Sequence, residues 1–155
     1  KKGKRAEKQQ VFVHGRRTST EALLTLDGII AATVVEGSMT QELFLDWPEN
    51  IVFPKCSAYP GPLSVLVMDN AKTHHGAEVL ELIDRFGVRV EFLPPYSPDL
   101  NPIEEAFSKI KHWLRHHQEY YLATTRDGII FDMYEVMEII TPDDAHGYFI
   151  HAGCF

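Results

Sequence analysis

The chain has 155 residues, a length that suits one domain with a single hydrophobic core. Apolar residues make up 45 % of it, which excludes a disordered or fibrous chain, and no apolar run approaches the roughly 18 residues of a membrane-spanning helix. The formal net charge of −7 argues mildly against a dedicated nucleic-acid-binding domain.

The first 17 residues differ in charge from the rest. They hold seven basic residues and one acid, so this segment carries +6 and the remainder −13. We expect residues 1–10 to form a poorly ordered basic arm and residues 11–155 to form the folded domain. The arm either engages phosphates or is a solvated end. Because the chain starts at Lys1, we interpret it as a fragment with a segment missing upstream.

Cysteine is scarce. Cys56 and Cys154 are too few for a disulfide framework or a zinc site, and the polar, basic N-terminus is unlike a signal peptide. We therefore expect a reducing, intracellular location: the nucleus in a eukaryote, otherwise the cytoplasm or nucleoid.

The first half of the chain favours strands. Residues 11–13 predict a short strand. The runs Glu21–Leu26 and Ile29–Val35 flank Asp27-Gly28, a strong hairpin signal. Residues 40–47 predict a short helix, with three apolar side chains on one side: Leu43, Phe44 and Trp47.

A strand–helix–strand unit follows. Ser64–Met68 is continuously apolar, which is typical of a strand buried on both faces. Gly76–Phe86 predicts an amphipathic helix that ends at Gly87. Val88–Leu93 predicts a second strand, parallel to the first.

The last third favours helices. After a proline-rich loop, Asn101 is a good N-cap and Pro102 a good first residue for a helix that reaches about His117. Its apolar stripe is formed by Ile103, Phe107, Ile110 and Leu114. We expect residues 118–155 to be loop, with a helix near residues 133–140 and a short helical segment from Pro142. These elements predict an α/β domain.

Two acids stand out. Asp69 directly follows the first parallel strand, where functional residues gather in open α/β sheets, although it could simply cap a turn with Asn70. Glu104 lies three residues after Asn101, so a capping box would explain it. About 100° of helical rotation from Ile103 places Glu104 at the edge of the buried stripe. We expect Glu105 to face solvent with its neighbours Lys109 and His112.

Carboxylates converging from two elements suit a hard divalent cation. Mg²⁺ prefers oxygen ligands and keeps waters beside one or two carboxylates. Two such ions, about 3.5–4 Å apart, can activate a nucleophile and stabilise the leaving oxygen of a phosphodiester.

Two strings carry a specific resemblance. Val-Leu-Val-Met-Asp-Asn-Ala-Lys-Thr-His-His at residues 65–75 and Leu-Pro-Pro-Tyr-Ser-Pro-Asp-Leu-Asn-Pro-Ile-Glu-Glu at residues 93–105 resemble the mariner-type superfamily of DDE transposases. The likeness covers nearly the whole chain, including Thr20–Gly37 and Ile140–Gly153. It implies a ribonuclease H-like fold with a mixed sheet flanked by helices. It also implies that Asp69 and Glu104, with 34 residues between them, are the second and third catalytic acids and metal ligands.

The resemblance further implies function and partners. We expect metal-dependent phosphodiester cleavage and strand transfer during transposon excision and integration, with two Mg²⁺ or Mn²⁺ ions. Transposon ends and target DNA are the expected partners, a homodimer is the candidate assembly, and no membrane or small-molecule cofactor is expected.

The family's first acid, which ends the first strand, has no match here. Asp27 is in the hairpin turn and Asp46 in a short helix. We therefore expect the first strand and a helix-turn-helix region to lie upstream, and two of three acids to leave this chain inactive. The alternative is a non-catalytic, transposon-derived remnant that binds DNA or a protein partner.

The remaining residues that could lie near the site or contact DNA are less specific signals. By position, Asn70 and His74 are candidate neighbours of the site. The basic residues that could contact DNA phosphates are Lys72, Lys109, Lys111 and Arg115, although a charged solvent face would explain them as well. We favour a solvated helix end over a metal site for His112, His116 and His117. Packing is favoured over base stacking for Tyr96 and Trp113.

Overall fold

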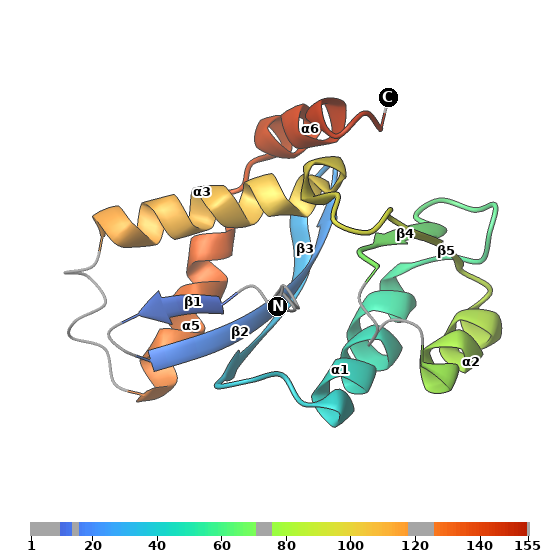
Figure 1. Cartoon of the computed structure of the whole chain (residues 1–155), viewed down its shortest axis with the longest axis horizontal. Helices are drawn as coiled ribbons and strands as arrows, with labels where there is room; N and C mark the ends of the chain where they lie inside the picture. The colour runs from blue at the N-terminus through green and yellow to red at the C-terminus, as the bar shows by residue number, and fades with distance from the viewer. Residues whose placement is uncertain (1–9, 14–15, 71–75, 118–125, 155) are drawn as a thin grey trace, which may run out of the picture.

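The strands of the protein form two sheets (Figure 1). In the computed structural model, which describes residues 10–13, 16–70, 76–117 and 126–154, the first sheet is antiparallel. It has the order β1 (Gln10–Val13), β2 (Arg16–Thr25) and β3 (Gly28–Glu36). The second sheet is the parallel pair β4 (Val65–Met68) and β5 (Arg89–Phe92). The expected mixed sheet is therefore divided, among the described residues, into an antiparallel sheet and a separate parallel pair.

The predicted hairpin forms between β2 and β3. Leu26 and Asp27 make the turn, and Gly28 opens β3 opposite Thr25 with φ +105°, which glycine adopts without strain. A side chain at Gly28 would place its Cβ 2.8 Å from the carbonyl oxygen of Ile140. The end of the hairpin is therefore pressed against the segment between helices α5 (Arg126–Met137) and α6 (Pro142–His151).

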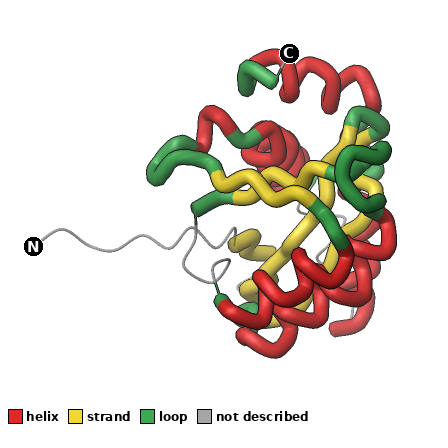
Figure 2. The backbone as a smooth tube through the Cα atoms, turned by 90° about the vertical axis from the view of Figure 1, so that its right-hand side faces the viewer, coloured by secondary structure: helices red, strands yellow, loops and turns green. Residues whose placement is uncertain are grey.

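Helices cover both faces of the β2–β3 hairpin, and in Figure 2 the strands lie between them. Side chains alternate along a strand, so Ala22 and Ala32 pack on one side, while Leu23 and Ala31 pack on the other. The first side faces α3 (Pro102–His116) and α5, with Phe107, Ile110, Leu114, Met133 and Val136 in the core. The second side faces a cluster of Trp47, Val52, Phe53, Leu82 and Val88.

That second cluster comes from α1 (Gln41–Trp47), the short turns η1 (Pro48–Val52) and η2 (Phe53–Lys55), α2 (Ala77–Phe86), and Val88 between α2 and β5. The predicted short helix forms as α1, and the Thr40 hydroxyl caps it by accepting from the Leu43 N–H. Phe44 and Trp47 are buried, but Leu43 is 42 % exposed, so the predicted one-sided grouping is wrong for Leu43. Leu43 lies about 100° from Phe44, which turns it out of the core.

The prediction that β4 is buried on both faces is wrong. Val65 and Val67 are 48 % and 46 % exposed, whereas Leu66 and Met68 pack inward beside Ile83 of α2. Among the described residues, helices pack on one face only of this short parallel pair. The local sequence could not reveal this, because a continuous apolar run has the same pattern whether or not its second face is covered.

The other elements match their predictions with shifted bounds. Gly87 ends α2 in the left-handed conformation, with φ +66°. A 3-10 turn, η4 (Pro98–Leu100), precedes α3, which runs to His116. Helix α5 starts before the expected 133–140 range and ends within it, at Met137, and α6 begins at Pro142 as expected. Over the described ranges, every helix is too short or too polar to span a bilayer.

Candidate active site

The candidate site lies where β4 and β5 end. The two strands run parallel with Met68 beside Phe92, and the backbone N–H of Leu93 donates a 2.8 Å hydrogen bond to the carbonyl of Met68. Asp69 and the loop from Leu93 therefore leave the same edge of the sheet. Carboxyl ends of parallel strands are where ligands bind in open α/β sheets.

Asp69 is held by this edge. Its residue is partly buried, and its Oδ1 atom is inaccessible to solvent, whereas Asn70 is exposed. A carboxylate with one buried oxygen keeps a fixed direction, as a metal ligand must. Two further predicted site residues, Lys72 and His74, lie outside the described residues.

The loop between β5 and α3 is built from prolines and short turns. The Ser97 hydroxyl donates to the carbonyl of Pro95 at 3.4 Å. Within η4, the N–H groups of Leu100 and Asn101 donate to Ser97 and Pro98. Prolines fix φ at their own positions, so this segment is stiff although it has little regular structure.

Glu104 lies in the first turn of α3 and is partly buried, at the edge of the apolar stripe as expected. Asn101 is the N-cap, but its side chain makes no capping hydrogen bond. A complete capping box forms instead at α6, between Thr141 and Asp144. The reciprocal capping that offered a structural explanation for Glu104 is therefore not formed at α3.

The prediction that Glu105 and Lys109 face solvent with His112 is right only in part. His112 is exposed, whereas α6 packs along the side of α3 that carries the other two and leaves their side chains 43 % and 41 % exposed (Figure 1). The carboxylate of Glu105 lies 3.3 Å from the His151 ring nitrogen. The Lys109 ammonium donates to Asp144 at 2.6 Å and to the carbonyl of Ile139 at 3.3 Å. These bonds give Lys109 a structural role, and the proposed phosphate contact would have to compete with them.

The ion pair between Lys109 and Asp144 also lowers the pKa of Asp144. The hydrogen bond from Lys109, helped by the backbone N–H of Thr141, holds the pKa of Asp144 below its ordinary value.

The end of α3 carries rings and cations. The His112 and His116 rings lie 4.2 Å apart and are tilted by 40°, whereas Trp113 stacks on His117 at 4.0 Å. The partly buried Trp113 therefore packs locally, as expected. The exposed Arg115 donates to the carbonyl of Lys111, and both cations remain candidates for DNA contact. Over the described part of the chain, no three His, Cys, Asp or Glu side chains cluster closely enough to hold a metal ion.

Tyr96 departs from its prediction. Its side chain is 96 % exposed, so it does not pack on the loop. Its φ of +61° is uncommon outside glycine. Sequence reasoning missed this because neither exposure nor a left-handed backbone is encoded by the Pro-Pro-Tyr-Ser-Pro composition alone.

Asp27 and Asp46 lie away from the ends of the parallel strands. Asp27 is exposed in the β2–β3 turn. Asp46 is exposed on α1 and accepts a 2.7 Å hydrogen bond from the Asn50 side chain. Neither follows a strand of the parallel pair, as expected from the sequence.

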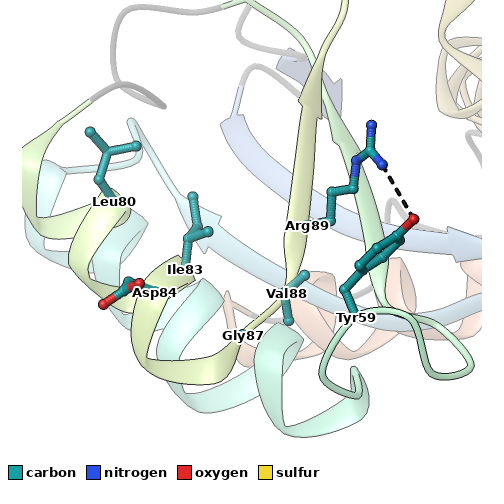
Figure 3. Close-up of a pocket in the computed structure, with 7 residues that line it drawn as sticks. All are labelled: Tyr59, Leu80, Ile83, Asp84, Gly87, Val88 and Arg89. Atoms are coloured by element: carbon teal, nitrogen blue, oxygen red, sulfur yellow. Dashed lines mark hydrogen bonds between the residues drawn. The ribbon is translucent and has the colours of Figure 1, made fainter.

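A surface depression of about 450 Å³ is unrelated to these carboxylates (Figure 3). Tyr59 and Arg89 line it on one side, and Leu80 and Ile83 on the other. The Arg89 guanidinium lies over the Tyr59 ring at 5.3 Å. Arg89 starts β5 and pairs with Val65, so the depression is at the opposite end of the strands from Asp69.

Comparison with known families gives one match over most of the chain. The profile described as the DDE superfamily endonuclease family matches residues 1–124. No curated protein matches the sequence.

Solved structures of the Mos1 transposase match this chain. The Mos1 transposase catalytic domain with raltegravir and Mg is 16 % identical, with a TM-score of 0.53 over 94 % of this chain and 80 % of that one. A Mos1 strand transfer complex is 16 % identical (TM-score 0.47), and a Mos1 mariner paired end complex with Mn is 14 % identical (TM-score 0.44). They match 99 % and 98 % of this chain, which spans 50 % and 47 % of theirs. The likeness to the catalytic domain supports the expected ribonuclease H-like fold.

Proposed function

The chain belongs to the DDE superfamily of endonucleases, and we propose that it is a DNA transposase or endonuclease domain whose Asp69 and Glu104 are metal ligands. The observation that carries the proposal is the junction of the two strand ends. The bond from Leu93 to Met68 fixes the point where Asp69 leaves β4 beside the loop that leads to Glu104.

The donor set fits a hard divalent cation. Both groups are carboxylates, both are partly buried, and each is attached to a regular element or its end. Mg²⁺ or Mn²⁺ bound there would activate water and stabilise the leaving oxygen of a phosphodiester. The Mos1 catalytic domain of similar fold is described with Mg, which supports this choice of metal.

The proposed substrate is DNA, in the form of transposon ends and a target. The family's description as endonucleases supports a phosphodiester substrate. Arg115 and Lys111 of α3 supply exposed or partly exposed cations for phosphates. A homodimer remains the proposed assembly.

Two carboxylates should hold metal less tightly than three. We therefore infer that this chain, assayed as it stands, binds divalent metal weakly and cleaves DNA slowly or not at all. The second candidate, a non-catalytic DNA-binding remnant, rests on the first acid of the family pattern having no match in this sequence.

Plasmid nicking tests the first candidate. Supercoiled DNA would be incubated with the chain and Mn²⁺, alongside Asp69→Asn, Glu104→Gln and the matched control Glu105→Gln. Nicking that is lost in the first two variants and kept in the control supports the enzyme. Nicking that persists in Asp69→Asn rejects the assignment. Because the enzyme candidate is itself expected to nick slowly or not at all, the remnant is supported only by DNA binding without nicking together with Mn²⁺ binding that neither Asp69→Asn nor Glu104→Gln changes.

A further inference from the structure

The side chain of Tyr96 is exposed to solvent and does not pack on its loop. Its side chain is 96 % exposed, the largest value among the exposed apolar and aromatic residues described. Its φ of +61° is a conformation that glycine tolerates and bulky residues rarely adopt. Tyr96 buries almost no surface in this strained conformation, so packing does not offset the strain. This indicates that Tyr96 has a role other than folding.

The position of the loop relates Tyr96 to the carboxylates. Leu93 is bonded to Met68, next to Asp69, and Tyr96 is three residues further along. Three residues span at most about 11 Å, at roughly 3.6 Å each. One DNA strand advances about 3.4 Å per nucleotide, so the ring can reach bases within about three nucleotides of a phosphate at Asp69.

The segment is also stiff enough to hold the ring out. Pro94 and Pro95 precede Tyr96, Pro98 follows it, and the hydroxyl of Ser97 donates back to Pro95. A preformed aromatic platform needs little ordering when a base stacks on it.

We propose that Tyr96 stacks on an unpaired base of the DNA, next to the phosphate that Asp69 and Glu104 would engage. The inference rests on the proposed function and adds a contact to it. Stacking suits a chain with a net charge of −7, because it provides affinity that does not depend on positive charge. Attraction between charges alone would give a chain with this net charge only weak affinity for DNA.

The test is DNA binding by the whole chain, measured by fluorescence anisotropy. The probe is a duplex with a single-stranded 3′ overhang, carrying 2-aminopurine at one overhang position at a time. Tyr96→Ala should raise the Kd about five- to 150-fold, the range that corresponds to the ~1–3 kcal/mol of stacking per base. Tyr96→Phe and Tyr96→Trp should keep tight binding and quench the 2-aminopurine.

Two controls separate stacking from other effects. Tyr59→Ala removes a tyrosine that is 50 % exposed at the far end of the strands, and it should leave the Kd unchanged. The Kd ratio between wild type and Tyr96→Ala should stay constant as salt is raised, whereas the loss of a phosphate contact would change the salt slope.

A stability measurement excludes misfolding as the cause. Tyr96→Gly relieves the left-handed strain, so it should melt at or above the wild-type temperature while binding DNA as weakly as Tyr96→Ala. If the wild type binds and Tyr96→Ala binds equally well, the stacking inference is wrong and the proposed function stands. If the wild type binds none of the duplexes, both are wrong.

Discussion

The backbone N–H of Leu93 donates a 2.8 Å hydrogen bond to the carbonyl oxygen of Met68. This bond extends the pairing of β4 and β5 by one step and sets Asp69 beside the start of the loop that leads to α3. The first residue of the segment that leads to Glu104 therefore lies beside the end of the strand that Asp69 follows.

Leu93→Pro should remove the hydrogen bond to the Met68 carbonyl, because proline has no N–H to donate. We expect a loss of about 1–3 kcal/mol in the free energy of unfolding, the cost of leaving the Met68 carbonyl without its donor. Urea denaturation measures it. Leu93→Ala keeps the N–H and serves as the control; if both variants lose the same free energy of unfolding, the backbone bond does not stabilise this junction.

Gly28→Ala should destabilise the protein by roughly 1–3 kcal/mol, the usual cost of a sparsely populated backbone conformation. The position has φ +105°, and the new Cβ would be 2.8 Å from the Ile140 carbonyl oxygen. Gly37→Ala is the matched control, with φ +86° and open space around its Cβ. Thermal melting should show the larger loss at Gly28; equal losses would mean that the contact with Ile140 adds nothing.

The ion pair between Lys109 and Asp144 predicts a pH dependence. Lys109→Met should cost about 0.5–1 kcal/mol near pH 7, since the ammonium is partly exposed. The pKa of Asp144 is lowered in the folded chain. Its contribution is therefore fully present above the unfolded pKa near 4 and is lost as the pH falls through the folded value.

Denaturation of both proteins across acidic pH measures this effect. The stability difference between wild type and Lys109→Met should shrink as the pH drops below about 4. A difference that stays constant through this range would show that the pair does not stabilise the charged carboxylate.

Local signals predicted the elements well. The Asp-Gly dipeptide located the hairpin, and Gly87 located the end of α2. The apolar stripe of α3 identified residues that are buried in the structure, including Phe107 and Ile110. Each of these depends on neighbours a few residues apart, which a sequence displays directly.

Contacts between distant segments could not be predicted. Lys109 meets Asp144 and Glu105 meets His151 only because α6 folds back along α3. Val65 is exposed because the described helices cover only one face of its strand. The candidate acids were found through a resemblance, since either one alone fits ordinary turn or capping chemistry.

The two cysteines should differ in reactivity. Cys56 is partly buried, and desolvation raises its pKa, whereas Cys154 is exposed. Thiolate is the reacting form, so at neutral pH a thiol reagent should label Cys154 several-fold faster. Mass spectrometry after timed labelling measures both sites, and guanidinium should make the rates equal. Equal rates in the native protein would place Cys56 in solvent.

Divalent metal binding tests the central claim most directly. Mn²⁺ titration of the chain, followed by electron paramagnetic resonance, should show a binding site. Asp69→Asn and Glu104→Gln should each weaken Mn²⁺ binding at least about tenfold, because even the loss of a residue that only supports a metal ligand lowers metal affinity about 10–100-fold. Glu105→Gln, one residue along the same helix and engaged with His151, should bind as the wild type does. Unchanged Mn²⁺ affinity in both Asp69→Asn and Glu104→Gln would contradict the account.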